Sequence, residues 1–237
     1  MQTQQLAGTY TAADASPDVR AAFIRRTYQH LAMAILAFVA LEFVFFQTPI
    51  ANALFRVMVG VKYSWLLVLG AFMVVSWVAE KWAHSATSRG IQYLGLGLYV
   101  VAQAIIFVPL LFIAVNFSTP DTIPIAAVIT GLLFLGLTVT AFTTRKDFSF
   151  LGGILKVGGF VALGIIVCSI MFGFNLGLIF ASVMVVFAAA AILYSTSRVI
   201  HDYNPDQHVA ASLSLFASIA LLFWYVLRIL ISLGSND

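Results

Sequence analysis

Residues 91–115, IQYLGLGLYVVAQAIIFVPLLFIAV, decide the fold, because they form one unbroken apolar run without a charged side chain. A helix that crosses the hydrocarbon core of a bilayer needs about 20 such residues. A strand of a membrane barrel would be about ten residues long and would alternate apolar and polar side chains. The stretch therefore predicts a transmembrane helix, surrounded by lipid rather than by water.

Further stretches of the same kind occupy most of the remaining chain, at 28–46, 64–83, 123–143, 151–172, 176–198 and 209–233. Hydrophobic residues make up 62% of the chain, charged residues make up 9%, and the mean hydropathy is +1.04, values that exclude an ordinary water-soluble domain. We predict an all-α integral membrane protein with seven transmembrane helices. Segment 47–63 contains a short amphipathic run, which we interpret as a helix within a loop.

The first 19 residues are polar and lack the basic and then apolar layout of a cleavable signal peptide. We predict a disordered cytoplasmic tail at 1–19, followed by one membrane domain at 20–237. The single cysteine, Cys168, lies within a predicted span, where a thiol acts as a small apolar side chain. A lone cysteine excludes internal disulfides.

The basic residues indicate the orientation of the chain in the membrane. If the amino terminus lies inside, the cytoplasmic segments carry Arg20, Arg25, Arg26, Lys81, Arg89, Arg145, Lys146 and Arg198, whereas the opposite loops carry only Arg56 and Lys62. Lysine and arginine favour the cytoplasmic side, which predicts a cytoplasmic amino terminus and an external carboxyl terminus. Because these residues are spread over several loops rather than gathered in a patch, we expect no nucleic-acid partner.

Polar side chains within the predicted spans are candidates for function, because each is costly in lipid unless it is paired or hydrated. At 1.5 Å per residue, Glu42, Gln103 and Arg228 lie about 21, 18 and 27 Å from the inner edge. Glu42 and Arg228 differ by about one helical turn in depth, and we hypothesise that they form an ion pair. The cluster of three either lines a cavity or fixes helix packing, and both interpretations remain open.

Signatures of catalysis are absent from the chain. It contains no GxxxxGK[ST] phosphate loop, no GxSxG elbow and no HExxH motif. The histidines lie near the predicted cytoplasmic edge with irregular spacing, which is weak evidence for a metal site. We predict that the protein is not an enzyme and that it holds no cofactor or bound metal.

Four segments resemble one known family. They read FIRRTYQHLAMAI at 23–35, TTRKDFSFLGGIL at 143–155, AAILYSTSRVIHDY at 190–203 and SLSLFASIALLFWYVLRIL at 212–230. In order and spacing they are similar to the Bax-inhibitor-motif (TMBIM) membrane proteins, and most to their bacterial YccA-like branch. The resemblance implies a seven-helix bundle in the bacterial inner membrane, with the last helix surrounded by the other six.

The resemblance implies two alternative functions. One is a pH-sensitive leak of Ca²⁺, gated by an aspartate pair on the last two spans. The other is binding to the membrane-anchored protease FtsH and modulation of its activity, with the amino-terminal tail as a handle.

The chain departs from the channel pattern at the gate, because Ser195 and Ser218 stand where channel-like relatives carry the aspartates. Two serines neither share a titrating proton nor supply carboxylate ligands to calcium. Arg145, Lys146 and Asp147 match the family's loop motif, in which Arg145 and Asp147 are expected to anchor the loop at the headgroup level. We therefore favour the FtsH modulator and keep the calcium leak as the alternative.

Overall fold

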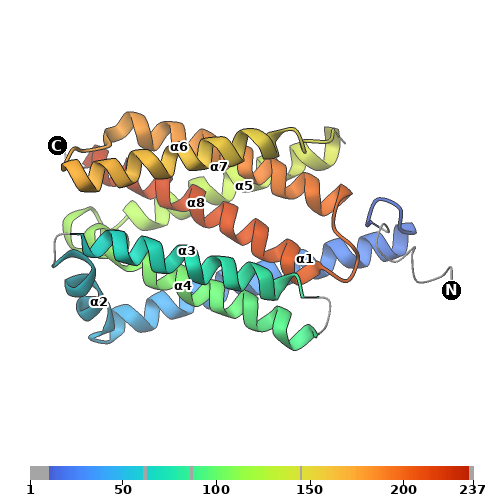
Figure 1. Ribbon diagram of the computed structural model, residues 1–237, viewed down its shortest axis with the longest axis horizontal. Coiled ribbons are helices and arrows are strands. Elements are labelled where there is room, and N and C mark those ends of the chain that lie inside the picture. The colour runs from blue at the N-terminus through green and yellow to red at the C-terminus, as the bar shows by residue number, and fades with distance from the viewer. Residues whose placement is uncertain (1–10, 61–62, 86–87, 145, 235–237) are drawn as a thin grey trace.

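The structure is a computed structural model that describes residues 11–60, 63–85, 88–144 and 146–234 (Figure 1). Within these residues all regular secondary structure is helical. The helices are α1 (Pro17–Gln47), α2 (Ile50–Val59), α3 (Ser64–Ala83), α4 (Arg89–Phe117), α5 (Thr122–Thr144), α6 (Leu151–Phe172), α7 (Gly177–His201) and α8 (His208–Gly234). All except α2 are long and apolar enough to cross a membrane, which confirms the seven predicted spans.

The sequence predicts the helix bounds well where apolar residues begin and end abruptly. Helices α3 and α6 match the predicted spans 64–83 and 151–172 at both ends. Helix α2 lies within segment 47–63, as predicted. By contrast, α1 begins at Pro17 rather than near residue 28, because proline is well suited to a first helical position and Asp18 complements the positive end of the helix dipole.

The described part of the predicted tail differs from a disordered segment. Ala12 is fully buried, and its backbone N–H donates to the carbonyl oxygen of Tyr203 at 2.8 Å. The Arg20 guanidinium donates to the carbonyl of Ala12 at 2.8 Å and also to that of Ala13. Residues 11–16 are thus fixed to the loop between α7 and α8, and the folded part begins before residue 20. Residues 1–10 lie outside the described residues.

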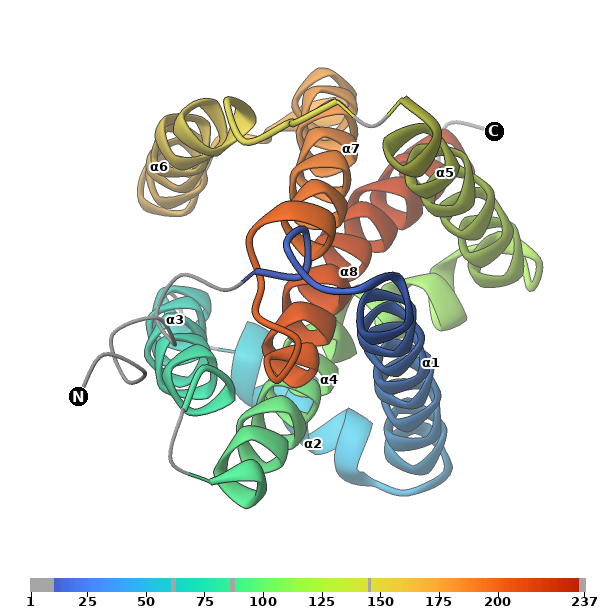
Figure 2. The same cartoon turned by 90° about the vertical axis from the view of Figure 1, so that its right-hand side faces the viewer.

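Helix α8 occupies the centre of the bundle, as predicted, and Figure 2 shows it running obliquely between its neighbours. It packs against α1, α3, α4, α5 and α7. Helix α4 is equally enclosed, since each of these two helices buries fourteen residues. Helix α6 packs mainly on α7 and stands outside the ring, so the last helix is surrounded by five long helices rather than six.

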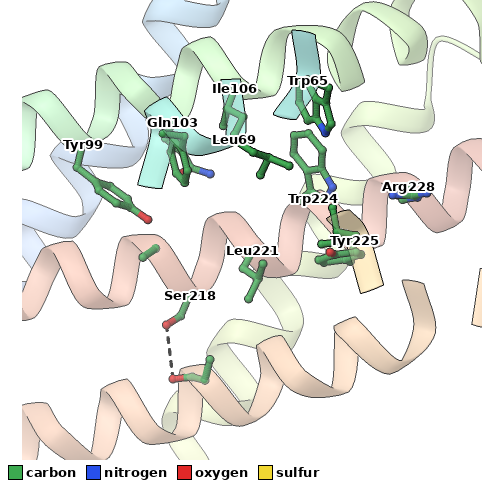
Figure 3. A pocket seen from close by; sticks show the side chains of 14 residues that line it. Trp65, Leu69, Tyr99, Gln103, Ile106, Ser218, Leu221, Trp224, Tyr225 and Arg228 are labelled. Atoms are coloured by element: carbon green, nitrogen blue, oxygen red, sulfur yellow. Dashed lines mark hydrogen bonds between the residues drawn. The ribbon is translucent and has the colours of Figure 1, made fainter. Parts of the chain in front are cut away.

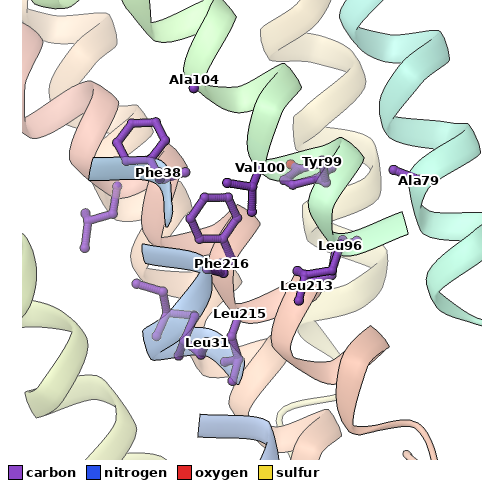
Figure 4. Close-up of a cluster of buried hydrophobic side chains, with 14 of the residues drawn as sticks. Leu31, Phe38, Ala79, Leu96, Tyr99, Val100, Ala104, Leu213, Leu215 and Phe216 are labelled. Carbon is purple, nitrogen blue, oxygen red and sulfur yellow. The ribbon is translucent and has the colours of Figure 1, made fainter. Parts of the chain in front are cut away.

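An aromatic cluster joins α1, α4 and α8 near the middle of the bundle (Figure 4). Phe38 of α1 meets Phe107 of α4 edge-to-face, with 5.1 Å between ring centroids, and meets Phe216 of α8 at 6.1 Å. Tyr99 of α4 contacts Phe216 from the other side, also at 6.1 Å. Such edge-to-face pairs add stability beyond burial alone and fix how the helices face one another.

The outer faces of the helices are apolar and exposed, as expected for a surface in contact with lipid. Leu67, Phe172 and Ile179 are each more than 70% exposed. We call the end of the bundle where α1 begins the amino-terminal end, and the end that carries α2 the opposite end. Most described basic residues lie at the amino-terminal end, namely Arg20, Arg25, Arg26, Lys81, Arg89, Lys146 and Arg198.

Candidate functional site

The two serines that replace the expected aspartates touch each other across the interface between α7 and α8. Ser195 Oγ of α7 lies 2.9 Å from Ser218 Oγ of α8, and both residues are buried. One turn earlier on α8, Ser214 Oγ donates to Ser195 Oγ at 3.1 Å. We call Ser195, Ser214 and Ser218 the serine contact.

The serine contact is neutral and its hydroxyls are satisfied within the protein. Ser218 Oγ lies 3.0 Å from the carbonyl oxygen of Ser214 and 3.5 Å from that of Ala191, which Figure 3 shows as a dashed line. Hydroxyls that bond across and along helices in this way link the helices together. The arrangement joins α7 to α8 and offers no charge to a cation.

A cavity of about 390 Å³, here called the inner cavity, begins at the serine contact and runs along α8 toward the opposite end (Figure 3). Ser218, Tyr99 and Gln103 lie toward one end of it, and Arg228 lies at the other. Since Ser218 and Arg228 are ten positions apart on α8, the cavity extends about 15 Å along the helix. Gln103 and Arg228, predicted as members of an intramembrane cluster, therefore line one cavity.

A second space of about 530 Å³, the outer cavity, continues toward the opposite end beside α2 and the start of α3. Trp65, Trp224 and Arg228 line both cavities. The rings of Trp65 and Trp224 are stacked, with 6.3 Å between centroids and 20° between planes. This aromatic pair and the arginine stand at the boundary between the two cavities.

The structure does not pair Glu42 with Arg228, contrary to our hypothesis. The ion pairs among the described residues are Arg89–Asp206 and Arg198–Asp202, and Glu42 is buried with both carboxylate oxygens unpartnered. Depth alone suggested the pair, but the helix faces differ. Arg228 shares its face of α8 with Leu221 and Trp224, toward α3, whereas the face of α8 that meets α1 lies on the other side.

The described part of the loop motif docks on the amino-terminal end of the bundle. The backbone N–H of Phe148 donates to the buried hydroxyl of Ser197 on α7 at 2.9 Å. Asp147 accepts from the backbone N–H of Ser149 at 2.8 Å and from its hydroxyl at 3.0 Å, which lowers the pKa of Asp147 below its usual value. The loop is thus anchored to α7, and its position at the headgroups stays a prediction.

The other two residues of the loop motif add less. Lys146 is exposed at the amino-terminal end. Arg145 lies outside the described residues. No three histidine, cysteine, aspartate or glutamate side chains gather as a metal site in the part of the chain that the structure describes.

The family model "Inhibitor of apoptosis-promoting Bax1", Bax1-I, matches residues 20–236. The chain belongs to the Bax1-I family. The matched residues include nearly all of the seven long helices and the residues of the serine contact and of both cavities.

Three relatives illustrate the range of the family. Protein LIFEGUARD 4 of Arabidopsis thaliana is 31% identical over 224 residues, which cover 90% of this chain and 86% of the relative. The uncharacterized protein PA2604 of Pseudomonas aeruginosa is 40% identical over 113 residues, 47% of this chain and 50% of the relative. The modulator of FtsH protease YccA of Escherichia coli is 34% identical over 123 residues, 52% of this chain and 56% of YccA. The matches to PA2604 and YccA thus span about half of those proteins.

The sequence interpretation missed the tryptophans that line this Bax1-I cavity system. Trp65 lies at the start of α3, where tryptophan is usually ascribed to the membrane interface, and Trp224 lies within the apolar run of α8. Their stacking joins residues from the second and the last span, and a single sequence carries no signal for that contact. The position of Trp224 one turn before Arg228 was the available hint, because the two share a helix face.

Proposed function

We propose that this Bax1-I protein is a multi-pass inner-membrane protein that binds the protease FtsH and modulates its activity. The observation that carries the proposal is the 34% identity to the modulator of FtsH protease YccA. The distribution of basic residues supports a cytoplasmic amino-terminal end. The serine contact supports a role in binding rather than in conduction, because neutral hydroxyls stand where the alternative function needs carboxylates.

The amino-terminal end offers one continuous surface for such a partner. Segment 11–16 is bonded to Tyr203 in the loop between α7 and α8, and Arg198 lies 4.7 Å from the centroid of the Tyr203 ring. Arg198 also pairs with Asp202 at 3.4 Å. The loop at 146–150 is bonded to Ser197 on the same turn of α7. We infer that FtsH contacts this surface, beside the fixed segment 11–16.

Co-purification of FtsH from membranes tests the proposal. The tagged full chain is compared with a variant that lacks residues 1–10 and with Lys146→Gln, which removes an exposed charge at the amino-terminal end. Arg56→Gln removes a charge near the opposite end and is the matched control. We expect the full chain and Arg56→Gln to retain FtsH, and the other two variants to retain less. Failure of the full chain to retain more FtsH than an unrelated seven-span protein would refute the proposal.

The alternative is a pH-sensitive calcium leak, and the two cavities along α8 are the observation in its favour. Two features weigh against it. No carboxylate lines either cavity within the described residues, and Arg228 places a positive charge on both. Calcium flux into liposomes that contain the purified protein, measured at acid and at neutral pH, decides between the two functions. We expect no flux above that of empty liposomes.

A further inference from the structure

We propose that the inner cavity binds an anionic amphiphile with a single apolar chain, and that Arg228 holds its anionic group. The ligand class is a carboxylate or phosphate attached to one chain of medium length. This inference does not depend on the proposed function, because it rests on the charge, shape and lining of the cavity.

The first observation is an arginine without a partner. Arg228 makes no ion pair and no hydrogen bond with any part of the chain that the structure describes. It lies six residues before the end of α8, so its Cα is roughly 9 Å along the helix from that end. A cationic side chain within a transmembrane helix is costly unless it is paired or hydrated. The guanidinium presents five N–H donors, whose planar fork matches a carboxylate or a phosphate.

The second observation is the sign of the charge in both cavities. Tyr99, Gln103, Ser218 and Tyr225 contribute hydroxyl and amide groups to the inner cavity, and Arg228 is the charged residue among those that line it. Within the described residues neither cavity has an acidic side chain. The lining therefore attracts anions and repels cations.

The third observation is the apolar middle of the inner cavity. Between Arg228 and the polar end, Leu69, Ile106 and Leu221 line it, together with the stacked rings of Trp65 and Trp224. Binding pockets for small molecules have volumes of about 300 to 1,000 Å³, and the 390 Å³ found here lies near the lower limit. The space suits one chain better than the two chains of a phospholipid.

The fourth observation is a thin wall toward the lipid. On the side of α6, Ile166 is the residue that lines the cavity, and α6 packs mainly on α7. Helix α6 contacts α3 only slightly, far less than α3 contacts α4. We infer that an amphiphile enters between α3 and α6 from the membrane, with its charged group toward the opposite end.

Quenching of tryptophan fluorescence tests the proposal directly, because Trp65 and Trp224 line the cavity. The reporter protein carries Trp77→Phe and Trp82→Phe, which remove the two tryptophans that are 63% and 40% exposed. The probes are a brominated fatty acid, the brominated alcohol with the same chain, a brominated phosphatidylglycerol and acetate. All are added at pH 8 to the full chain in a nonionic detergent.

We expect saturable quenching by the fatty acid alone. The alcohol and the phospholipid should quench weakly and without saturation, and acetate should neither quench nor compete. Arg228→Gln should weaken binding of the fatty acid by about tenfold or more, since it removes a charge-assisted hydrogen bond. Arg228→Lys should retain most of the binding, and Arg56→Gln, which removes a charge outside the cavity, should retain all of it.

Leu221→Phe provides a test that keeps the charge and adds no tryptophan, because a larger ring at this position fills part of the middle of the cavity and should weaken binding strongly. Equal quenching by the acid and the alcohol would overturn the proposal. So would fatty-acid binding that is unchanged in both Arg228→Gln and Leu221→Phe. Saturable quenching by phosphatidylglycerol in place of the fatty acid would overturn the single-chain ligand. If Arg228→Gln fails to fold, loss of binding in Arg228→Lys or unchanged binding in Leu221→Phe overturns the proposal.

Discussion

The two halves of α8 are packed very differently. From His208 to Ser218, nine of eleven residues are buried, and the serine contact ties this half to α7. From Ile219 to Gly234, five of sixteen residues are buried, and the helix borders both cavities. One continuous helix thus belongs to a closed core in its first half and to a cavity wall in its second.

The difference shows how a bundle in lipid separates stability from binding. Because lipid is as apolar as the side chains, helices associate through close packing and hydrogen bonds rather than through the hydrophobic effect. Both are concentrated in the first half of α8. The second half is free to keep an unpaired arginine and open volume, which are the requirements of a binding site.

The largest effect on stability should come from replacing a leucine by alanine in each half of α8. Leu215 is fully buried, whereas Leu221 borders the inner cavity. We expect Leu215→Ala to lower the free energy of unfolding by about 2 to 5 kcal/mol, because it leaves a void in a closed core. Leu221→Ala should cost less than half as much, because it enlarges an existing cavity. Thermal unfolding in detergent measures both, and equal losses would show that the two halves are packed alike.

Two glycines of α4 test how closely the amino-terminal half is packed. A Cβ atom at Gly95 would lie 2.6 Å from the carbonyl oxygen of Ala79 and 2.7 Å from the backbone nitrogen of Ala83, both on α3. A Cβ atom at Gly97 would meet nothing within 4 Å. We expect Gly95→Ala to destabilise the protein by about 1 to 3 kcal/mol, since rigid backbone must move.

Gly97→Ala is the matched control for this prediction. It should be neutral or raise the free energy of unfolding by up to about 1 kcal/mol, because alanine favours the helix. Unfolding curves of the two variants in the same detergent provide the measurement. Equal effects of the two substitutions would show that the backbone of α3 does not approach Gly95 of α4 as closely as the structure has it.

The sequence predicts where the helices of this protein lie in the chain better than it predicts which neighbour each helix face contacts. Seven apolar runs of sufficient length have no alternative in lipid, which is why the spans are confirmed. The start of α1 was placed late because residues 17–27 are polar enough to lie outside the bilayer and still be helical. Apolar length reports where a chain is buried in the membrane, whereas helix caps and the first turn determine where a helix begins.

The candidate site was predicted in part for a related reason. Counting residues along each span gave depth, and it placed Gln103 and Arg228 along the same cavity. The same counting suggested that Glu42 pairs with Arg228, and this is not observed, because depth does not specify which neighbour a helix face meets. The contact between Ser195 and Ser218 was accessible only through the family resemblance, which aligns the two positions with a known pair.

The serine contact should have a smaller effect than the packing changes. We expect a double-mutant cycle of Ser195→Ala and Ser218→Ala to give a coupling energy of about 0.6 kcal/mol, with about 1.7 kcal/mol as the upper end. Ser182→Ala is a control, since that exposed hydroxyl bonds only to the carbonyl of Leu178 on its own helix. Thermal unfolding of the four proteins gives the coupling energy. A value of zero would mean that the two hydroxyls do not hold α7 to α8.

The smallest effect should lie in the loop at 146–150 and should depend on pH. Hydrogen bonds from the backbone and hydroxyl of Ser149 lower the pKa of Asp147 in the folded loop. Because the pKa is lower in the folded loop, the ionised carboxylate stabilises the loop at pH values above the unfolded pKa of about 3.9. This contribution is lost as the pH falls through the folded pKa. Amide hydrogen exchange at Ser149, corrected for the intrinsic rate, should therefore accelerate as the pH falls below about 4. Asp147→Asn should remove this acceleration and Asp121→Asn should preserve it, because Asp121 lies at the opposite end of the bundle, before α5. An unchanged pH profile in Asp147→Asn would show that the carboxylate does not hold the loop, and that the bond from Phe148 to Ser197 suffices.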